Sequence, residues 1–103
     1  MAQVYGQTRA TRIQETAITC NSTSWTALEG ATPLANRVGI ELYNKGQAAT
    51  AKLYLSYDNS VSVKLRKAIE TGAYHFEPTG NGLTLYGRTQ SATARIIVTE
   101  YGV

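Results

Sequence analysis

The fold is decided by the stretch Asn36-Arg37-Val38-Gly39-Ile40-Glu41-Leu42-Tyr43-Asn44-Lys45-Gly46, followed by Ala51-Lys52-Leu53-Tyr54-Leu55-Ser56-Tyr57. Apolar side chains occupy every second position in both stretches, and this alternation places them on one face of a pleated strand. Asn44-Lys45-Gly46 offers residues that accept the positive backbone dihedral of a chain reversal. We therefore expect a half-buried antiparallel hairpin or meander at the centre of the molecule.

Further short strands are expected on both sides of this centre. Their positions are 13–20, a short segment around Trp25 and Leu28, 61–69, 74–76, 83–87 and 94–99. Pro33 marks a loop over 30–36, and Pro78 to Gly82 is the strongest loop signal in the chain. Seven or eight short strands separated by turns, with no convincing helix, predict a single antiparallel β-sandwich of the jelly-roll or immunoglobulin-like kind.

A chain of 103 residues is sufficient for one domain. Residues 1–11 are polar and weakly patterned, so we interpret them as an N-terminal arm and 12–103 as the β-sandwich domain. We expect the arm to dock on a partner or on a neighbouring copy; the alternative is an arm packed on its own domain. The residues expected to contact partners are Val4, Tyr5, Arg9, Arg12, Trp25 and Tyr74.

The charge balance is modest. Ten basic and seven acidic residues give a net charge of +3, and the basic residues are scattered rather than gathered on one face, so no nucleic-acid partner is expected. The densest basic spot, Arg66-Lys67 with Lys64 nearby, is interpreted as a solvated edge. No membrane-spanning run and no signal peptide are found, which predicts a protein made in a cytoplasm that stays soluble or joins an assembly there.

Residues that carry catalysis are few. The chain has one histidine, His75, and one aspartate, Asp58; we expect His75 at a surface or interface and Asp58 in a turn. The single cysteine, Cys20, is expected to be a small buried apolar residue. No metal, nucleophile or phosphate-binding motif is present, so we expect a protein without enzymatic activity and without a cofactor.

Aromatic residues leave a second function class open. Trp25, Tyr54, Tyr74 and Tyr86 are able to form a stacking platform for sugar rings. The more ordinary interpretation places most of them in the core or at a subunit interface, where a wide ring with one polar group is favoured.

Residues 36–101 resemble small virion proteins of tailed bacteriophages. The resemblance is carried by the motifs Asn36 to Gly46, Lys52-Leu53-Tyr54-Leu55-Ser56, Ile69-Glu70-Thr71-Gly72, Leu85-Tyr86-Gly87, and Ala94-Arg95-Ile96-Ile97-Val98-Thr99-Glu100-Tyr101. It implies a β-sandwich that attaches to the particle. The expected role is a capsid decoration protein that binds the major capsid protein and its own copies, located in the virion and assembled in the host cytoplasm. A neck, tail or fibre-base component and a carbohydrate-binding module are the alternatives.

Overall fold

The computed structural model describes residues 11–46, 51–59, 68–80 and 82–103. Within these residues the chain forms seven strands and no helix. The strands are β1 (Arg12–Cys20), β2 (Thr26–Ala27), β3 (Arg37–Asn44), β4 (Leu53–Ser56), β5 (Tyr74–Glu77), β6 (Tyr86–Thr89) and β7 (Ala94–Gly102).

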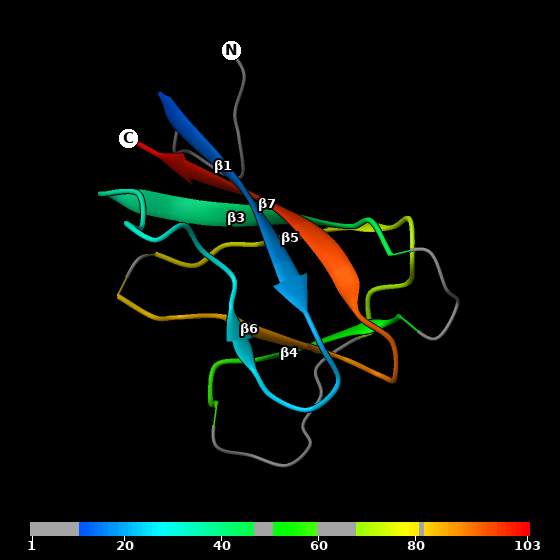
Figure 1. The fold of residues 1–103 in the computed structure, drawn as a ribbon. Coiled ribbons are helices and arrows are strands. Elements are labelled where there is room, and N and C mark those ends of the chain that lie inside the picture. The colour runs from blue at the N-terminus through cyan, green and yellow to red at the C-terminus, as the bar shows by residue number, and fades with distance from the viewer. Residues whose placement is uncertain (1–10, 47–50, 60–67, 81) are drawn as a thin grey trace.

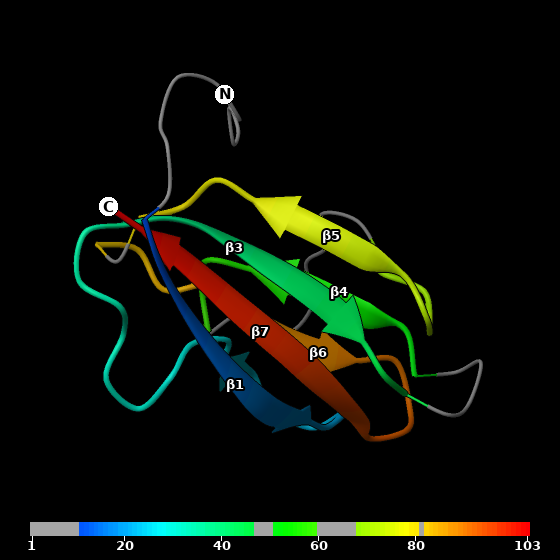
Figure 2. The same ribbon diagram turned by 90° about the horizontal axis from the view of Figure 1, so that it is seen from above.

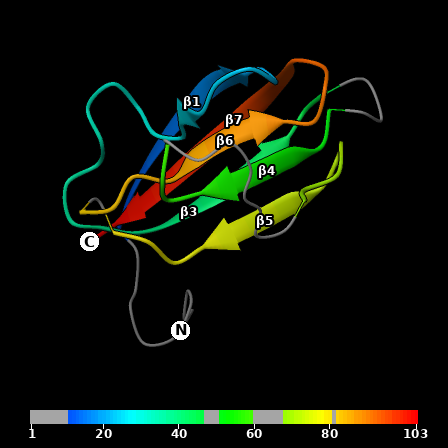
Figure 3. The same ribbon diagram turned by 90° about the horizontal axis from the view of Figure 1, so that it is seen from below.

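The strands form two antiparallel sheets that face each other (Figure 1). The four-stranded sheet has the order β1-β7-β3-β5, with its strands side by side in Figure 2. The three-stranded sheet has the order β2-β6-β4 and lies in front of the larger sheet in Figure 3. The expectation of a small all-β sandwich is confirmed.

The core lies between the two sheets and follows from the alternation of the strands. In β7, Ala94, Ile96 and Val98 are buried while the residues between them face outward, as predicted. The buried apolar residues are Cys20, Leu28, Ile40, Leu42, Ala51, Leu53, Leu55, Ile69, Leu85, Ala94, Ile96 and Val98. Cys20 is the small buried residue that the sequence predicts, and burial raises the pKa of its thiol to about 12.

The predicted central hairpin is wrong. β3 pairs with β7 and β5 in one sheet, whereas β4 pairs with β6 in the other. The buried side chain of Asn44, at the end of β3, donates to the carbonyls of Ala51 (2.8 Å) and Ile69 (3.0 Å) and so fixes where the chain leaves the larger sheet. Alternation alone does not distinguish neighbouring strands of one sheet from strands of two sheets that face each other across a core, because in both cases every second residue is buried.

The remaining predicted elements differ in detail. The strand predicted over 83–87 is β6, which begins only at Tyr86, and Leu83 is exposed. Of the strand predicted over 61–69, residues 61–67 lie outside the described residues. Ile69 forms a single β-bridge to Leu53. The basic spot at 64–67 and residues 1–10 of the predicted arm also lie outside them.

Candidate binding surfaces

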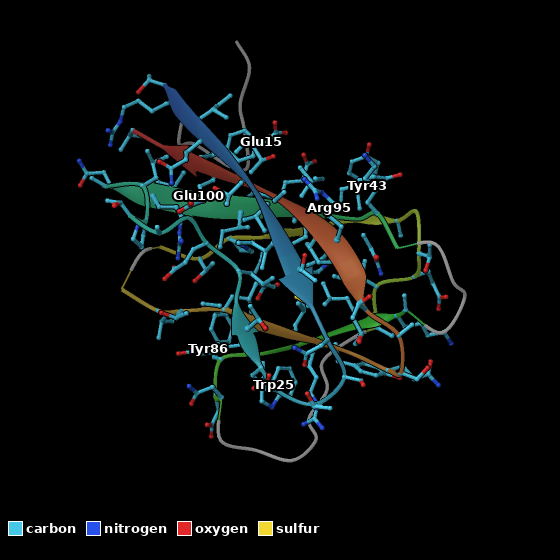
Figure 4. The ribbon with its side chains drawn as sticks, in the orientation of Figure 1. Glu15, Trp25, Tyr43, Tyr86, Arg95 and Glu100 are labelled. Atoms are coloured by element: carbon cyan, nitrogen blue, oxygen red, sulfur yellow. The ribbon has the colours of Figure 1, made fainter. Side chains whose placement is uncertain are left out.

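The largest regular surface is the side of the four-stranded sheet that faces away from the three-stranded sheet, here called the outer face. Figure 2 looks onto it, and Figure 4 shows Glu15, Tyr43 and Arg95 on this side. Strand alternation and register place the following residues on it: Ile13, Glu15, Ala17 and Thr19 from β1; Arg95, Ile97, Thr99 and Tyr101 from β7; Gly39, Glu41 and Tyr43 from β3; Tyr74 and Phe76 from β5.

Apolar and aromatic groups dominate the outer face. Tyr74 is 67% exposed and stacks on Tyr43 with a ring-centroid distance of 4.6 Å. Phe76 and Tyr101 form a second, looser ring pair at 6.5 Å. Ile13, on the edge strand, is 65% exposed. The strands thus present one exposed ring, Tyr74, beside partly buried Tyr43, Phe76 and Tyr101, and such aromatic residues are enriched at the centres of protein interfaces.

The ring of Phe76 lies directly on Gly39. A Cβ atom at position 39 would come within 2.2 Å of Phe76 Cζ, so only glycine leaves room for the ring. Gly39 also follows an irregularity in the pairing of β3 with β7, between Arg37 and Gly39. The absent side chain therefore flattens this part of the outer face and lets an aromatic ring cover it.

A buried ion pair organises the loops at one end of the sandwich. Arg37 Nη1 donates to Glu100 Oε1 at 3.0 Å, and both side chains are fully buried. Arg37 also donates to Glu29 (3.1 Å) and to the carbonyls of Thr79, Gly80 and Leu83. Glu100 accepts from the backbone N–H groups of Gly30 and Leu34 and from Gln14. The pair thereby ties the loop before β3 to the loop after β5.

The pKa of Glu100 reflects this setting. Burial alone raises the pKa of a carboxyl group, but the hydrogen bonds from Leu34, Gly30, Arg37 and Gln14 favour the charged form and bring the pKa of Glu100 below its ordinary value. All acceptor positions of the carboxylate are engaged by the chain itself. The cluster is therefore structural and offers no free group to a ligand.

A smaller polar cluster lies on the inner side of β5. Glu77 is buried, accepts from Tyr57 Oη at 2.7 Å and lies 2.8 Å from Nε2 of His75. His75 borders a cavity of about 200 Å³ lined also by Ala68, Ile69, Glu70, Ala73 and Tyr74. The expected surface histidine is thus a half-buried, hydrogen-bonded residue. Among the described residues no group of three or more His, Cys, Asp or Glu side chains is placed to hold a metal ion.

The outward side of the three-stranded sheet carries a second aromatic group. Tyr54 and Tyr86 lie on β4 and β6, and Arg88 is the register partner of Tyr54. The guanidinium of Arg88 lies 5.8 Å from the ring centre of Trp25, which precedes β2. Figure 4 shows Trp25 and Tyr86 beside this sheet. Of the four residues of the expected stacking platform, Tyr54 and Tyr86 share the smaller sheet with Trp25 beside it, whereas Tyr74 belongs to the other sheet.

The three predicted contact residues that the structure describes lie apart from one another. Arg12 donates to the carbonyls of Ala35 and Val103 at the end of the larger sheet. Trp25 lies by the smaller sheet, and Tyr74 lies on the outer face. Val4, Tyr5 and Arg9 lie outside the described residues. None of these placements tests partner binding, which stays a prediction.

The outer face is a unit that the sequence pattern does not reveal. Tyr43, Ile97 and Tyr101 join Tyr74 there through the order β1-β7-β3-β5. The alternation of Arg95, Ile97 and Thr99 signals a second, outward set of residues, but only the strand order shows which strands lie beside it.

Comparisons with protein-family models, with curated proteins and with solved structures gave no match. Within the residues that the structure describes, no helix is long and apolar enough to cross a membrane.

Proposed function

We propose that this protein is a non-enzymatic structural component of a bacteriophage virion, and that it acts as a capsid decoration protein that binds the coat-protein shell and its own copies. The observation that carries the proposal is the outer face, where exposed Ile13 and Tyr74 and half-buried Tyr43 present apolar surface on a rigid four-stranded sheet. Such a surface is typical of a protein that assembles with others.

The interior of the sandwich supports the same assignment. The buried Arg37–Glu100 pair holds loops together at one end of the sandwich. The sequence resemblance of residues 36–101 to small virion proteins supports the phage context. In this proposal the protein is assembled in the host cytoplasm and resides in the particle.

The test is the number of copies of this chain in each purified particle, measured by quantitative mass spectrometry against the major capsid protein. Hundreds of copies support decoration of the shell. A dozen or fewer indicate a neck, tail or fibre-base component, and absence from particles overturns the structural role.

A carbohydrate-binding module is the second candidate. It is favoured by Trp25, Tyr54 and Tyr86 on one sheet, since aromatic rings on a β-sheet can stack on sugars. A glycan panel read by Trp25 fluorescence tests it: a specific change that Trp25→Ala and Tyr86→Ala both abolish would favour this class, and no change with any glycan would remove it.

A further inference from the structure

Charged residues on the outer face lie in separate rows that cross the strands. Glu15 and Glu41 flank Thr99 in one row, because Thr99 pairs with both. Two residues further along, Ile97 pairs with Ala17 and Tyr43 in an uncharged row. Two residues beyond that lies Arg95. Exposed Lys45, directly after β3, continues the same row, because its backbone N–H donates to the carbonyl of Arg95 at 2.8 Å. The face thus has an acidic row, an apolar row and a basic row in order.

This order is self-complementary. Consider a two-fold axis that lies between two facing copies and runs parallel to the apolar row, perpendicular to the strands. Rotation about this axis brings the outer face of the second copy onto that of the first, and it reverses the order of the three rows along each strand. Each strand of the second copy then lies over the same strand of the first. Lys45 of one copy faces Glu41 of the other, and Arg95 faces Thr99 between the two carboxylates. The apolar row, with Tyr43 and Tyr74, meets its own equivalent.

The dimensions permit these contacts. Facing sheets pack about 10 Å apart, and rows two residues apart are separated by about 6.8 Å along a strand. The strands of two aligned sheets cross at about 30°. A charged residue one row away from the axis is therefore offset sideways by about 3.5 Å from the residue it faces, which is less than the spacing between strands. The flexible stem of Lys45 can span such a displacement.

We propose that the outer face binds a second copy of this chain in this two-fold arrangement, with Lys45 and Arg95 of each copy over the acidic row of the other. We infer a second copy as the partner because the outer face carries an acidic row on one side of its apolar row and a basic row on the other, so the face is complementary to itself. The inference deepens the proposed function, since it rests on the same face and names the partner there.

The expected dimer is of moderate strength. The four strands, nine residues long in β1 and β7, eight in β3 and four in β5, cover roughly 500 Å² per copy at ordinary strand spacings. The total of roughly 1,000 Å² is at the lower end for specific protein interfaces, so we expect a dissociation constant of micromolar order.

The experiment is sedimentation of the full chain across that concentration range, for the wild type, Glu41→Lys, Lys45→Glu, and an equimolar mixture of the two variants. Each variant alone places like charges opposite each other, so its dissociation constant should rise at least about tenfold. In the mixture, the lysine introduced at position 41 of one variant faces the glutamate introduced at position 45 of the other, and the two unchanged residues also face each other as an opposite-charge pair. The mixture should therefore regain association close to that of the wild type.

Matched controls separate this result from loss of structure. Gln90→Glu changes the charge at an exposed turn away from the outer face and should leave dimerisation unchanged. Far-UV circular dichroism checks that each variant is folded. A monomeric wild type, single variants that dimerise like the wild type, or folded variants whose mixture stays monomeric would each overturn the proposed interface. Because sedimentation needs no particle, a dimer found together with absence from virions would reject only the virion role.

Discussion

Arg37 shows how one side chain can hold two loops in place. Its guanidinium has five N–H donors, and acceptors lie in range of all its nitrogens: Glu29, Glu100 and the carbonyls of Thr79, Gly80 and Leu83. Because the side chain is buried, each of these bonds replaces one that water supplied in the unfolded chain. Nothing in the sequence around Arg37 or Glu100 marks these residues as partners, since they are 63 residues apart and each has the pattern of an ordinary strand residue.

Replacing Glu100 by Gln should destabilise the protein by about 3–5 kcal/mol, because it leaves the buried charge of Arg37 without its main partner. Glu29→Gln is the matched control and should cost clearly less, since the side chain of Glu29 is partly exposed. Urea unfolding at pH 7 measures both. Equal losses for the two variants would show that burial of the Glu100 pair has no special weight.

The same carboxylate predicts a pH dependence. Since the folded state lowers the pKa of Glu100, its contribution to stability is complete above the ordinary carboxyl pKa near 4.5 and is lost as the pH falls through the lower folded-state pKa. Wild-type stability should therefore decline on acidification more steeply than that of Glu100→Gln. Parallel declines in urea unfolding measured from pH 7 downwards would contradict this assignment.

At the scale of strands, most of the pattern in the sequence is preserved in the structure. β1, β3, β5 and β7 occupy the expected positions because alternating residues need one buried side. Pairing was not predictable in the same way: β3 and β4 carry the same alternation, yet they lie in opposite sheets and contribute Leu42 and Leu55 to one core. The outer face escaped prediction for this reason, since a surface made by four strands depends on their order in space.

Gly39 and Phe76 provide a test of strand packing. Gly39→Ala should cost about 1–3 kcal/mol, because the new methyl group displaces the Phe76 ring. In a Phe76→Ala background the same change should cost almost nothing, since the ring is gone. Gly82→Ala, where a Cβ meets open space, is the control. Thermal unfolding of the wild type, the two single variants and the double variant gives the coupling energy, and an unchanged cost of Gly39→Ala in the Phe76→Ala background would refute the contact.

At the scale of the whole molecule, the two sheets share one core and one set of tied loops. Leu28, Leu53 and Leu85 from the side of the smaller sheet belong to the same buried group as Ile40, Ile96 and Val98 of the larger one. Glu100 on the larger sheet holds the loop that leads from β2 to β3 through Gly30 and Leu34. Neither sheet has a separate core, so the sandwich should unfold as one unit.

Trp25 makes this prediction measurable, because the only tryptophan of the chain lies beside the three-stranded sheet. Fluorescence of Trp25 should follow the same urea transition as far-UV circular dichroism, which reports on all strands. Glu100→Gln, a change in the other sheet, should shift both curves equally. A fluorescence midpoint that stays in place while the dichroism midpoint moves would show that the sheets unfold separately.

The pairing of β1 with β7 has a consequence for the synthesis of the chain. β7 lies between β1 and β3 and is the last of these strands along the sequence, so a nascent chain that ends before Ala94 holds β1 and the β3–β5 pair without the strand that joins them. The four-stranded sheet can be completed only after β7 has emerged from the ribosome. Completion of the larger sheet thus waits for its last strand, and a product truncated before β7 exposes unpaired strand edges of the kind that aggregate or recruit chaperones.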